Sequence, residues 1–547
     1  MTKVALSGAK MSTSDEEQSV HRICDDPSKI WERWWTKVGE LINPILVKEV
    51  RQSLKSRQFV LCFSLTLIAA VGWTFVAVAM LVPRIYYVPG GLQLLAGYFV
   101  ILHVPLMVII PFSAFRSLAT ETEDSTFELL SISTLSAKQI IRGKMVTSLL
   151  QVVLYLSALA PCIVLTYLLR GVGLFTILFI LGWTVIFSVC LVTVGLLLAS
   201  ISRSRLTQSS VSVLFLVGLL VATISWTMAV VQPDFMLSME SAPAEIPMVM
   251  FGVVTFVFAA IVLAMQSAAA AIDFASENKS TPIRWRILLL SLVAYFWMSV
   301  VCAANKITIP WLPGLTAIAI GYAFFGGLMC GEIGIVSPRA RRSLPKTFFS
   351  RALLTWLNPG SGMGYVFIIV TYAALVGTVG AQELYLSSRA DFMKNGMNAS
   401  VTLFGYALMC YLTCYVGITR LLMLAWGRFI PAPMVASAAI LIVLIVMGHL
   451  IPLVTIFALN DYQNFPYAWH QCANFMWTIM EMVEDRNTDQ IMFSLLLLTL
   501  ASVVIFVLNL FSLTNEVMVV RVAAPARVQE ETHKPAAPAI AIDPFRD

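Results

Sequence analysis

Long apolar stretches alternate with short polar segments along this chain. The polar segments hold nearly all of the Lys, Arg, Asp and Glu residues. A helix of about 20 apolar residues crosses a bilayer core of about 30 Å, and it satisfies its own backbone hydrogen bonds there. The pattern therefore predicts an all-α, polytopic integral membrane protein with about twelve transmembrane helices.

The apolar stretches give the expected membrane spans. Two of them, Ile287–Ala304 and Gly364–Ala381, are short, so one re-entrant segment and a count that differs by one or two stay open. The full set is Phe59–Val82, Leu92–Phe115, Met145–Leu169, Leu174–Ile201, Val211–Val231, Pro247–Ile272, Ile287–Ala304, Trp311–Val336, Gly364–Ala381, Val401–Ala425, Ala432–Leu459 and Ile491–Leu513.

Composition agrees with lipid as the main solvent of the chain. Apolar residues make up 59% of the 547 positions and charged residues 12%, against about 45–50% and about 25% in soluble domains. The net charge of +6 is spread over many short loops rather than gathered in one basic face. It therefore indicates contact with membrane lipids and no nucleic-acid partner.

The distribution of basic residues predicts the orientation of the chain. If the N-terminus lies inside, the inner segments hold 30 of the 36 Lys and Arg residues, and the outer loops hold the remaining six. Inner loops of membrane proteins are enriched in Lys and Arg. We therefore expect a multi-pass protein of the cell inner (plasma) membrane with both termini in the cytoplasm. Residues 1–30 are predicted to be a disordered cytoplasmic tail, and 515–547 a cytoplasmic C-terminal tail.

The segment before the first span, residues 31–58, has the pattern of an amphipathic helix. Apolar residues recur every fourth position, and basic residues lie roughly opposite. The apolar positions are Ile42, Leu46, Val50 and Leu54, and the basic ones are Lys48, Arg51 and Lys55. We expect this helix to lie flat on the inner membrane surface. Glu49 projects into its apolar sector and requires a partner, which is either another protein or a basic side chain.

The loop between spans two and three is divided by charge. Its first half carries Glu121, Glu123, Asp124 and Glu128, and its second half carries Lys138, Arg142 and Lys144. Ser and Thr residues separate the halves, which predicts two short helices joined by a polar turn. Such a hairpin suits docking on another protein. A solvated loop that only follows the positive-inside rule is the alternative.

Three strings in this region occur in a fixed order: ETEDSTFELL, then STLS, then Gly143–Lys144. Together with the preceding NPILVKEVRQSLKSRQF, they resemble the membrane subunits of ABC-2 type exporters. Ser125 and Thr134 depart from that family's pattern, since a glycine and a proline are expected there. The resemblance covers about residues 35–280, close to half of the chain.

The resemblance implies a permease that moves its substrate with ATP hydrolysed by a separate ABC ATPase subunit. Residues 59–280 would form the permease-like six-helix domain, and 31–58 its elbow helix. The implied ATPase-coupling loop comprises Glu121, Glu123, Thr126, Glu128, Leu129, Gly143 and Lys144. The elbow residues are Lys48, Glu49, Arg51 and Lys55. Residues 281–514 form a second six-helix membrane region without a second copy of the motif, so a pseudo-dimer and a homodimer both stay open.

The chain lacks the motifs of the common catalytic sites. It has no GxxxxGK[ST], HExxH or GxSxG string, and its nine cysteines form no metal-spaced cluster. We expect no enzyme activity, metal or cofactor in this chain. The alternatives to an exporter permease are a twelve-helix secondary active transporter and a non-transporting membrane scaffold.

Few ionisable residues fall within or at the edges of the apolar stretches: His103, Glu332, Arg420 and His449. Ion-coupled transporters need membrane-embedded carboxylates or equivalent ligands. We interpret Glu332 and Arg420 as markers of helix ends at the cytoplasmic face. A hydrogen-bonded structural histidine is favoured at positions 103 and 449 over a wetted helix kink.

The predicted orientation can be tested with reporter domains fused to each end of the full chain. We expect a reporter that matures only in the cytoplasm to be active at both termini. Activity of a reporter that matures only on the opposite side would contradict the orientation.

Overall fold

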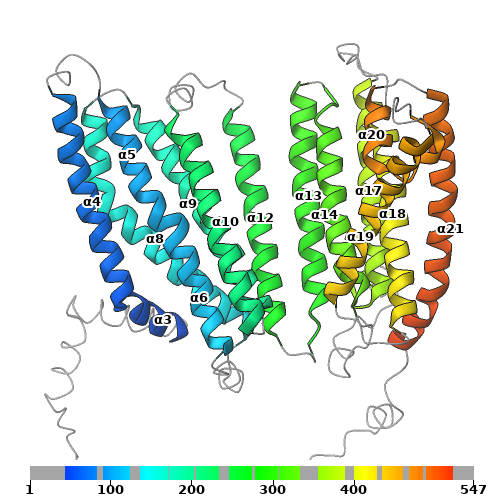
Figure 1. Ribbon diagram of the computed structural model, residues 1–547, viewed down its shortest axis with the longest axis horizontal. Coiled ribbons are helices and arrows are strands. Elements are labelled where there is room, and N and C mark those ends of the chain that lie inside the picture. Colours follow the sequence, from blue (N-terminus) through cyan, green and yellow to red (C-terminus); the bar gives the residue numbers. More distant parts are fainter. Residues whose placement is uncertain are drawn as a thin grey trace, which may run out of the picture. The chain divides into compact units, whose positions relative to one another are not determined.

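The computed structural model describes residues 44–82, 90–123, 136–169, 172–202, 205–232, 246–273, 277–305, 307–332, 355–387, 400–427, 434–459, 467–484 and 488–521. In these residues all regular structure is helical, and twelve helices are long and apolar enough to cross a membrane. The predicted all-α, polytopic fold with twelve spans is confirmed (Figure 1). The predicted N-terminal tail, residues 1–30, lies outside the described residues.

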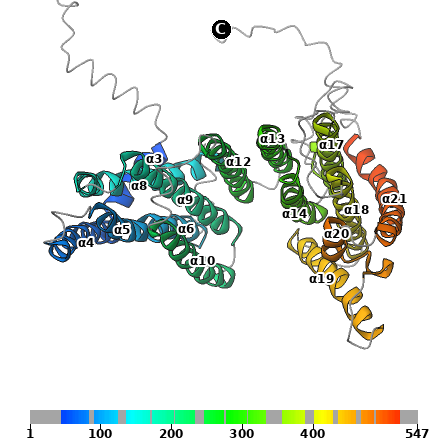
Figure 2. The same cartoon turned by 90° about the horizontal axis from the view of Figure 1, so that it is seen from above.

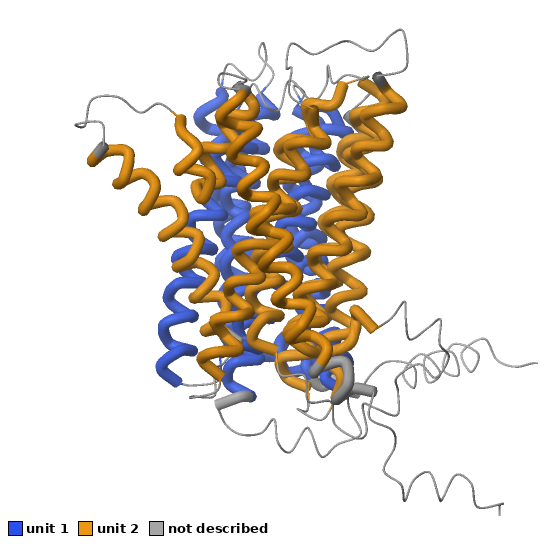
Figure 3. The backbone as a smooth tube through the Cα atoms, turned by 90° about the vertical axis from the view of Figure 1, so that its right-hand side faces the viewer, with its two compact units in different colours: residues 1–242 blue, residues 243–547 orange. Residues whose placement is uncertain are grey.

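The chain divides into two compact units, residues 1–242 and 243–547 (Figure 3). The helices of unit 1 are α3 (Pro44–Leu54), α4 (Arg57–Leu81), α5 (Gly91–His103), η2 (Val104–Ile109), α6 (Ile110–Glu123), α8 (Ala137–Leu168), α9 (Leu174–Ile201) and α10 (Arg205–Val231). Those of unit 2 are α12 (Ile246–Ile272), α13 (Ser280–Asn305), α14 (Trp311–Cys330), η3 (Thr355–Leu357), α17 (Ser361–Ser387), α18 (Val401–Trp426), α19 (Met434–Leu459), η4 (Trp469–Gln471), α20 (Phe475–Glu484) and α21 (Thr488–Arg521).

In unit 1 the second span has the largest buried share of residues. It is formed by α5, η2 and α6 in direct succession and packs against α4, α8, α9 and α10. The α4 contact includes two polar bonds: the Trp73 indole N–H donates to Leu94 O at 3.1 Å, and Thr74 Oγ1 lies 2.6 Å from the Tyr98 hydroxyl. The short helix α3 packs against α8 and lies across one end of the unit (Figure 1).

The second span contains a turn of π-helix, which follows from Pro105. Proline has no N–H to donate and clashes with the preceding turn, so the hydrogen-bond pattern shifts. In η2 the Ile110 N–H donates to Pro105 O, five residues back. Ser188 of α9 donates its hydroxyl to Leu106 O at 2.6 Å, so that carbonyl has a partner within the bundle.

In unit 2 helix α18 is the centre of the packing. It contacts α14, α17, α19, α20 and α21, which surround it in the view from above (Figure 2). Most of its central residues are buried, as are those of α17. Close contact between α14 and α19 depends on Gly327, where a Cβ atom would lie 2.8 Å from Leu441 Cδ2. Small residues permit such approaches between membrane helices.

Several boundaries differ from the sequence-based predictions. The two spans expected to be short are full-length helices, α13 and α17, because each begins with polar residues that are buried rather than solvated: Arg284 in α13 and Ser361 in α17. The amphipathic segment 31–58 contains α3 over Pro44–Leu54, and residues 31–43 lie outside the description. Helix α21 continues to Arg521, seven residues into the predicted C-terminal tail.

The unit boundary at residue 242 also differs from the sequence-based division at 280. Helix α12 falls in unit 2 because it packs on α13. Phe251 and Trp297 form an edge-to-face pair there, with ring centroids 5.6 Å apart. Aromatic pairs of this geometry stabilise a contact beyond simple apolar burial.

Candidate functional site

The third membrane helix begins within the string that carried the family resemblance. Ser136, the last residue of STLS, is the N-cap of α8 and forms a capping box with Gln139. The Gln139 N–H donates to Ser136 Oγ at 3.4 Å, and the Ser136 N–H donates to Gln139 Oε1 at 2.9 Å. Capping boxes of this kind fix the start of a helix.

This start corrects the prediction of a separate short helix for the basic half of the loop. The basic half of the loop, with Lys138, Arg142 and Lys144, forms the first turns of α8 itself. Glu121 and Glu123 belong to the last turn of α6, which continues the second span. The physical reason is the capping box, since it lets α8 begin well before the apolar stretch. Residues 124–135, with Thr126, Glu128 and Leu129, lie outside the described residues.

Lys144 lies at a junction of three helices. Its side chain is 2% exposed, and its Nζ lies 2.9 Å from Glu49 Oε1 of α3 and 2.8 Å from Glu121 Oε1 of α6. The ammonium also donates to Ser117 Oγ at 2.8 Å. The expectation that Glu49 would need a partner is confirmed, and the partner is a basic side chain. We call Glu49, Ser117, Glu121 and Lys144 the lysine junction.

The lysine junction satisfies a charge that could not otherwise be buried. An ammonium group removed from water costs several kcal/mol unless close anions and hydrogen bonds compensate it. The Lys144 ammonium donates to two carboxylates, to the Ser117 hydroxyl and, at 3.5 Å, to the Ser117 carbonyl, so its three protons have acceptors. A hydrogen bond from the Gln151 amide to the Ser53 hydroxyl joins α8 and α3 further along. Helices α3, α6 and α8 are therefore fastened together at one end of unit 1.

The other predicted site residues lie around this junction. Gly143 is buried in α8, and its carbonyl accepts from Thr147 Oγ1 at 3.0 Å. Arg51 is exposed on α3, as expected for its polar face, and Lys55 is exposed just beyond the end of α3. The backbones of Lys48 and Glu123 lie in α3 and α6, but their side chains lie outside the description.

Unit 2 contains a buried arginine that the sequence analysis missed. Arg284 is fully buried near the start of α13, and its Nη2 lies 2.6 Å from Glu332 Oε2, just beyond the end of α14. It also donates to the carbonyls of Trp356 at 2.8 Å and Gly360 at 3.1 Å, and to that of Asn358. Gly360 has a φ of 140°, a conformation that L side chains rarely adopt. Arg284 was missed because the predicted span began three residues after it.

Arg420 is also fully buried, within α18. Its Nη1 donates to Asn509 Oδ1 at 2.9 Å and to Ser512 Oγ at 2.6 Å, both on α21, and its Nε donates to Ser361 Oγ at 3.3 Å. The two arginines thus bind consecutive residues at the start of α17, Gly360 and Ser361. Glu332 lies just beyond the end of α14, as interpreted from the sequence, whereas Arg420 lies inside α18 and is held there by hydrogen bonds.

The two histidines of the spans are structural, as favoured from the sequence. His103 Nδ1 lies 2.7 Å from Thr227 Oγ1 of α10, and its ring stacks on Phe99. His449 Nδ1 lies 2.8 Å from Asn474 Oδ1, beside the start of α20. Within the described part of the chain, no group of three or more His, Cys, Asp and Glu residues has the geometry of a metal site.

Comparisons with known proteins add no identity to this geometry. No protein-family model, curated protein or solved structure matches the chain. The arrangement of the lysine junction must therefore be interpreted from its own chemistry. The lysine junction contains ion pairs and hydrogen bonds between helices, so it can hold α3, α6 and α8 in a fixed arrangement.

We predict that Lys144→Met destabilises the protein by about 2–4 kcal/mol, because two carboxylates lose the cation that they share. Breaking a fully buried ion pair costs about 3–5 kcal/mol. The cost is smaller here because both carboxylates are partly exposed. The shift in thermal unfolding temperature of the purified protein, in a single detergent, measures the effect.

Lys138→Met, at an exposed position on the same helix, is the matched control and should change stability little. Adding Glu49→Gln and Glu121→Gln to Lys144→Met should recover part of the loss. Equal melting temperatures for the two lysine variants would refute the junction's structural role.

Proposed function

We propose that this chain is the membrane-spanning permease of an ATP-binding cassette exporter, driven by ATP hydrolysis in a separate ATPase subunit. The observation that carries the proposal is the lysine junction. Its charged members come from the three sequence segments of the resemblance: Glu49 from the elbow segment, Glu121 from the acidic string, and Lys144 from the closing Gly-Lys pair. Glu49 and Glu121 lie 95 and 23 residues before Lys144 in the sequence.

The junction supplies a physical route for force. The segment between α6 and α8, residues 124–135, is bounded by the last turn of α6, which contains Glu121, and by the Ser136 cap of α8. An ATPase that binds this segment would act on the ends of two membrane helices at once. Because Lys144 fastens α3 to both, the three would move as one body, as packed elements do in hinge and shear transitions.

The distribution of carboxylates supports an external source of energy. In the twelve spans the acidic residues are Glu121, Glu383 and Asp489, and each lies within a few residues of a span end. Glu121 is bound to Lys144, and Glu383 accepts hydrogen bonds from the Val401 and Thr402 N–H groups at the start of α18. Proton- and sodium-coupled carriers instead use carboxylates or equivalent ligands inside the membrane. This distribution favours a permease over a secondary transporter.

We expect the ATPase to act at the end of unit 1 that carries the lysine junction. Lys and Arg residues are in excess in the predicted inner loops, so we expect this end to be cytoplasmic. The membrane is the cell inner (plasma) membrane. The ATPase would carry the nucleotide-binding motif that this chain lacks, so the purified chain alone is expected to hydrolyse no ATP.

We predict that Glu123→Lys together with Glu128→Lys lowers the amount of co-purifying ATPase at least about tenfold, because reversed charges in an interface cost several kcal/mol. Glu121 is left unchanged, since its reversal would break the lysine junction and confound binding with folding. The measurement is ATPase activity and subunit content after purification of the tagged full chain from its native membrane.

Glu277→Lys, at an exposed acidic position in another predicted inner loop, is the control and should leave the complex intact. Recovery of a full ATPase complex with the double variant would contradict the assignment of the coupling segment. Solute uptake by the chain alone, in ATP-free vesicles under a pH gradient, would overturn the exporter proposal itself.

A further inference from the structure

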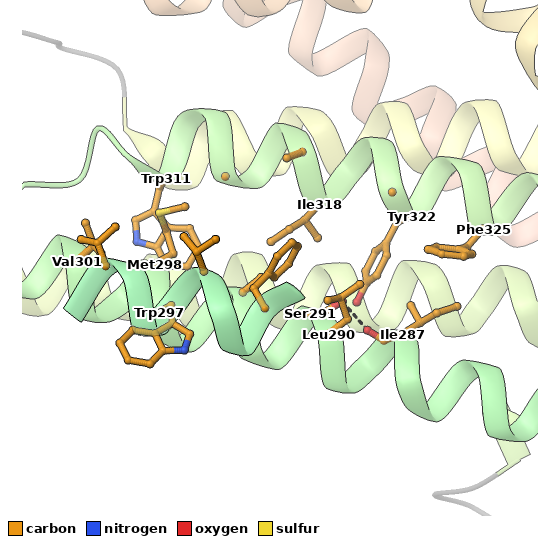
Figure 4. A pocket seen from close by; sticks show the side chains of 18 residues that line it. Ile287, Leu290, Ser291, Trp297, Met298, Val301, Trp311, Ile318, Tyr322 and Phe325 are labelled. Atoms are coloured by element: carbon orange, nitrogen blue, oxygen red, sulfur yellow. Dashed lines mark hydrogen bonds between the residues drawn. The ribbon is translucent and has the colours of Figure 1, made fainter. Parts of the chain in front are cut away.

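Unit 2 contains a cavity of about 450 Å³ between α12, α13 and α14. Eighteen residues line it, and Figure 4 shows Trp311 beside Met298 and Val301 towards one end and Phe325 at the other. Gly321 of α14 is among the lining residues, and a Cβ atom added there would meet nothing within 4 Å. A larger side chain at position 321 would therefore begin in open space.

The lining is almost entirely hydrocarbon. Nitrogen or oxygen atoms occur in four of its side chains, those of Ser291, Trp297, Trp311 and Tyr322, and none of the eighteen residues is charged. The Ser291 hydroxyl already donates to Ile287 O at 2.9 Å. Pockets for polar ligands place several convergent polar groups around the ligand. This cavity instead suits an occupant without polar atoms along most of its length.

The dimensions match one extended hydrocarbon chain. From Trp311 to Phe325, α14 rises by about 21 Å, at about 1.5 Å per residue. An apolar cavity of about 150 Å³ holds one benzene molecule, so the volume here corresponds to about eighteen carbon atoms. A long, narrow site of that capacity fits a single acyl chain better than a compact ring system.

The α12 residues that line the cavity are partly exposed. The lining residues Val249, Val253 and Phe256 are 41%, 40% and 40% exposed. At the opposite end of the lining from Phe325, Trp311 is buried, and its indole N–H has no hydrogen-bond partner among the described residues. An ester carbonyl is the acceptor that a phospholipid carries at the head end of each chain. Tryptophan commonly occupies the headgroup level of membrane proteins.

We propose that this cavity binds one acyl chain of a phospholipid from the surrounding bilayer, with its ester end near Trp311 and its tail towards Phe325. Lipid chains are the hydrocarbon available at this depth, and an empty apolar cavity forfeits the dispersion contacts that such a chain supplies. The site is independent of the proposed ATPase partner, since it lies wholly within unit 2.

The test uses the full-length protein in bilayer nanodiscs that contain a trace of phosphatidylcholine with a photoactivatable group midway along one chain. After illumination, peptide mapping should place labels on α12, α13 and α14 residues that line the cavity. Gly321→Leu fills the space and should lower this labelling about tenfold, because excluding even two methylene groups from an apolar site has that effect on binding.

Gly377→Leu is the matched control. Gly377 lies on α17 in the same unit, and an added Cβ there also meets nothing within 4 Å, but it does not line the cavity. It should leave the labelling unchanged. If Gly321→Leu fails to fold, Ala294→Leu provides a second filling variant, and the wild-type map stands by itself. Absence of wild-type labels from the lining, or equal labelling in wild type and the filled variant, would overturn the proposal.

Discussion

The organisation of unit 1 depends on the ion pairs that the buried Lys144 ammonium forms with Glu49 and Glu121. The Lys144 side chain is 2% exposed, and its buried charge is compensated by the carboxylates of Glu49 and Glu121. Because these partners come from α3 and α6, the requirement for neutralisation also fixes how three helices meet. The amphipathic helix α3 is thereby tied to the membrane-spanning helices of unit 1.

Unit 2 uses the same chemistry with arginine in place of lysine. Arg284 and Arg420 approach the start of α17 and bind Gly360 and Ser361 in succession. Arginine presents several N–H donors in a fixed plane, so it can bind several carbonyl and side-chain oxygens at once. Each unit therefore has charged networks near helix ends, and neutral hydrogen bonds such as those of His103 and Ser188 add to the apolar packing further inside the spans.

The fold was predictable from the sequence, because hydrophobic runs long enough to span a bilayer leave few alternatives to helices. The need for a partner at Glu49 was also predictable, since a carboxylate in an apolar sector cannot stay unpaired. The identity of that partner was not, because Lys144 lies 95 residues away. The start of α8 could have been found, since Ser136 and Gln139 have the spacing of a capping box. Arg284 was missed because it precedes the apolar stretch that marked the span, and because three of its acceptors are backbone carbonyls, which leave no signature in sequence.

If the proposed ATPase acts on this chain, the lysine junction should make α3, α6 and α8 move as one body. Spin labels at the exposed positions 51 on α3 and 138 on α8 would report the separation of α3 and α8 in a complex with the proposed ATPase, with and without ATP. A rigid junction gives the same narrow distance distribution in both states, which broadens when Lys144 is replaced by Met. A separation that changes with ATP while Lys144 is intact would contradict the claim.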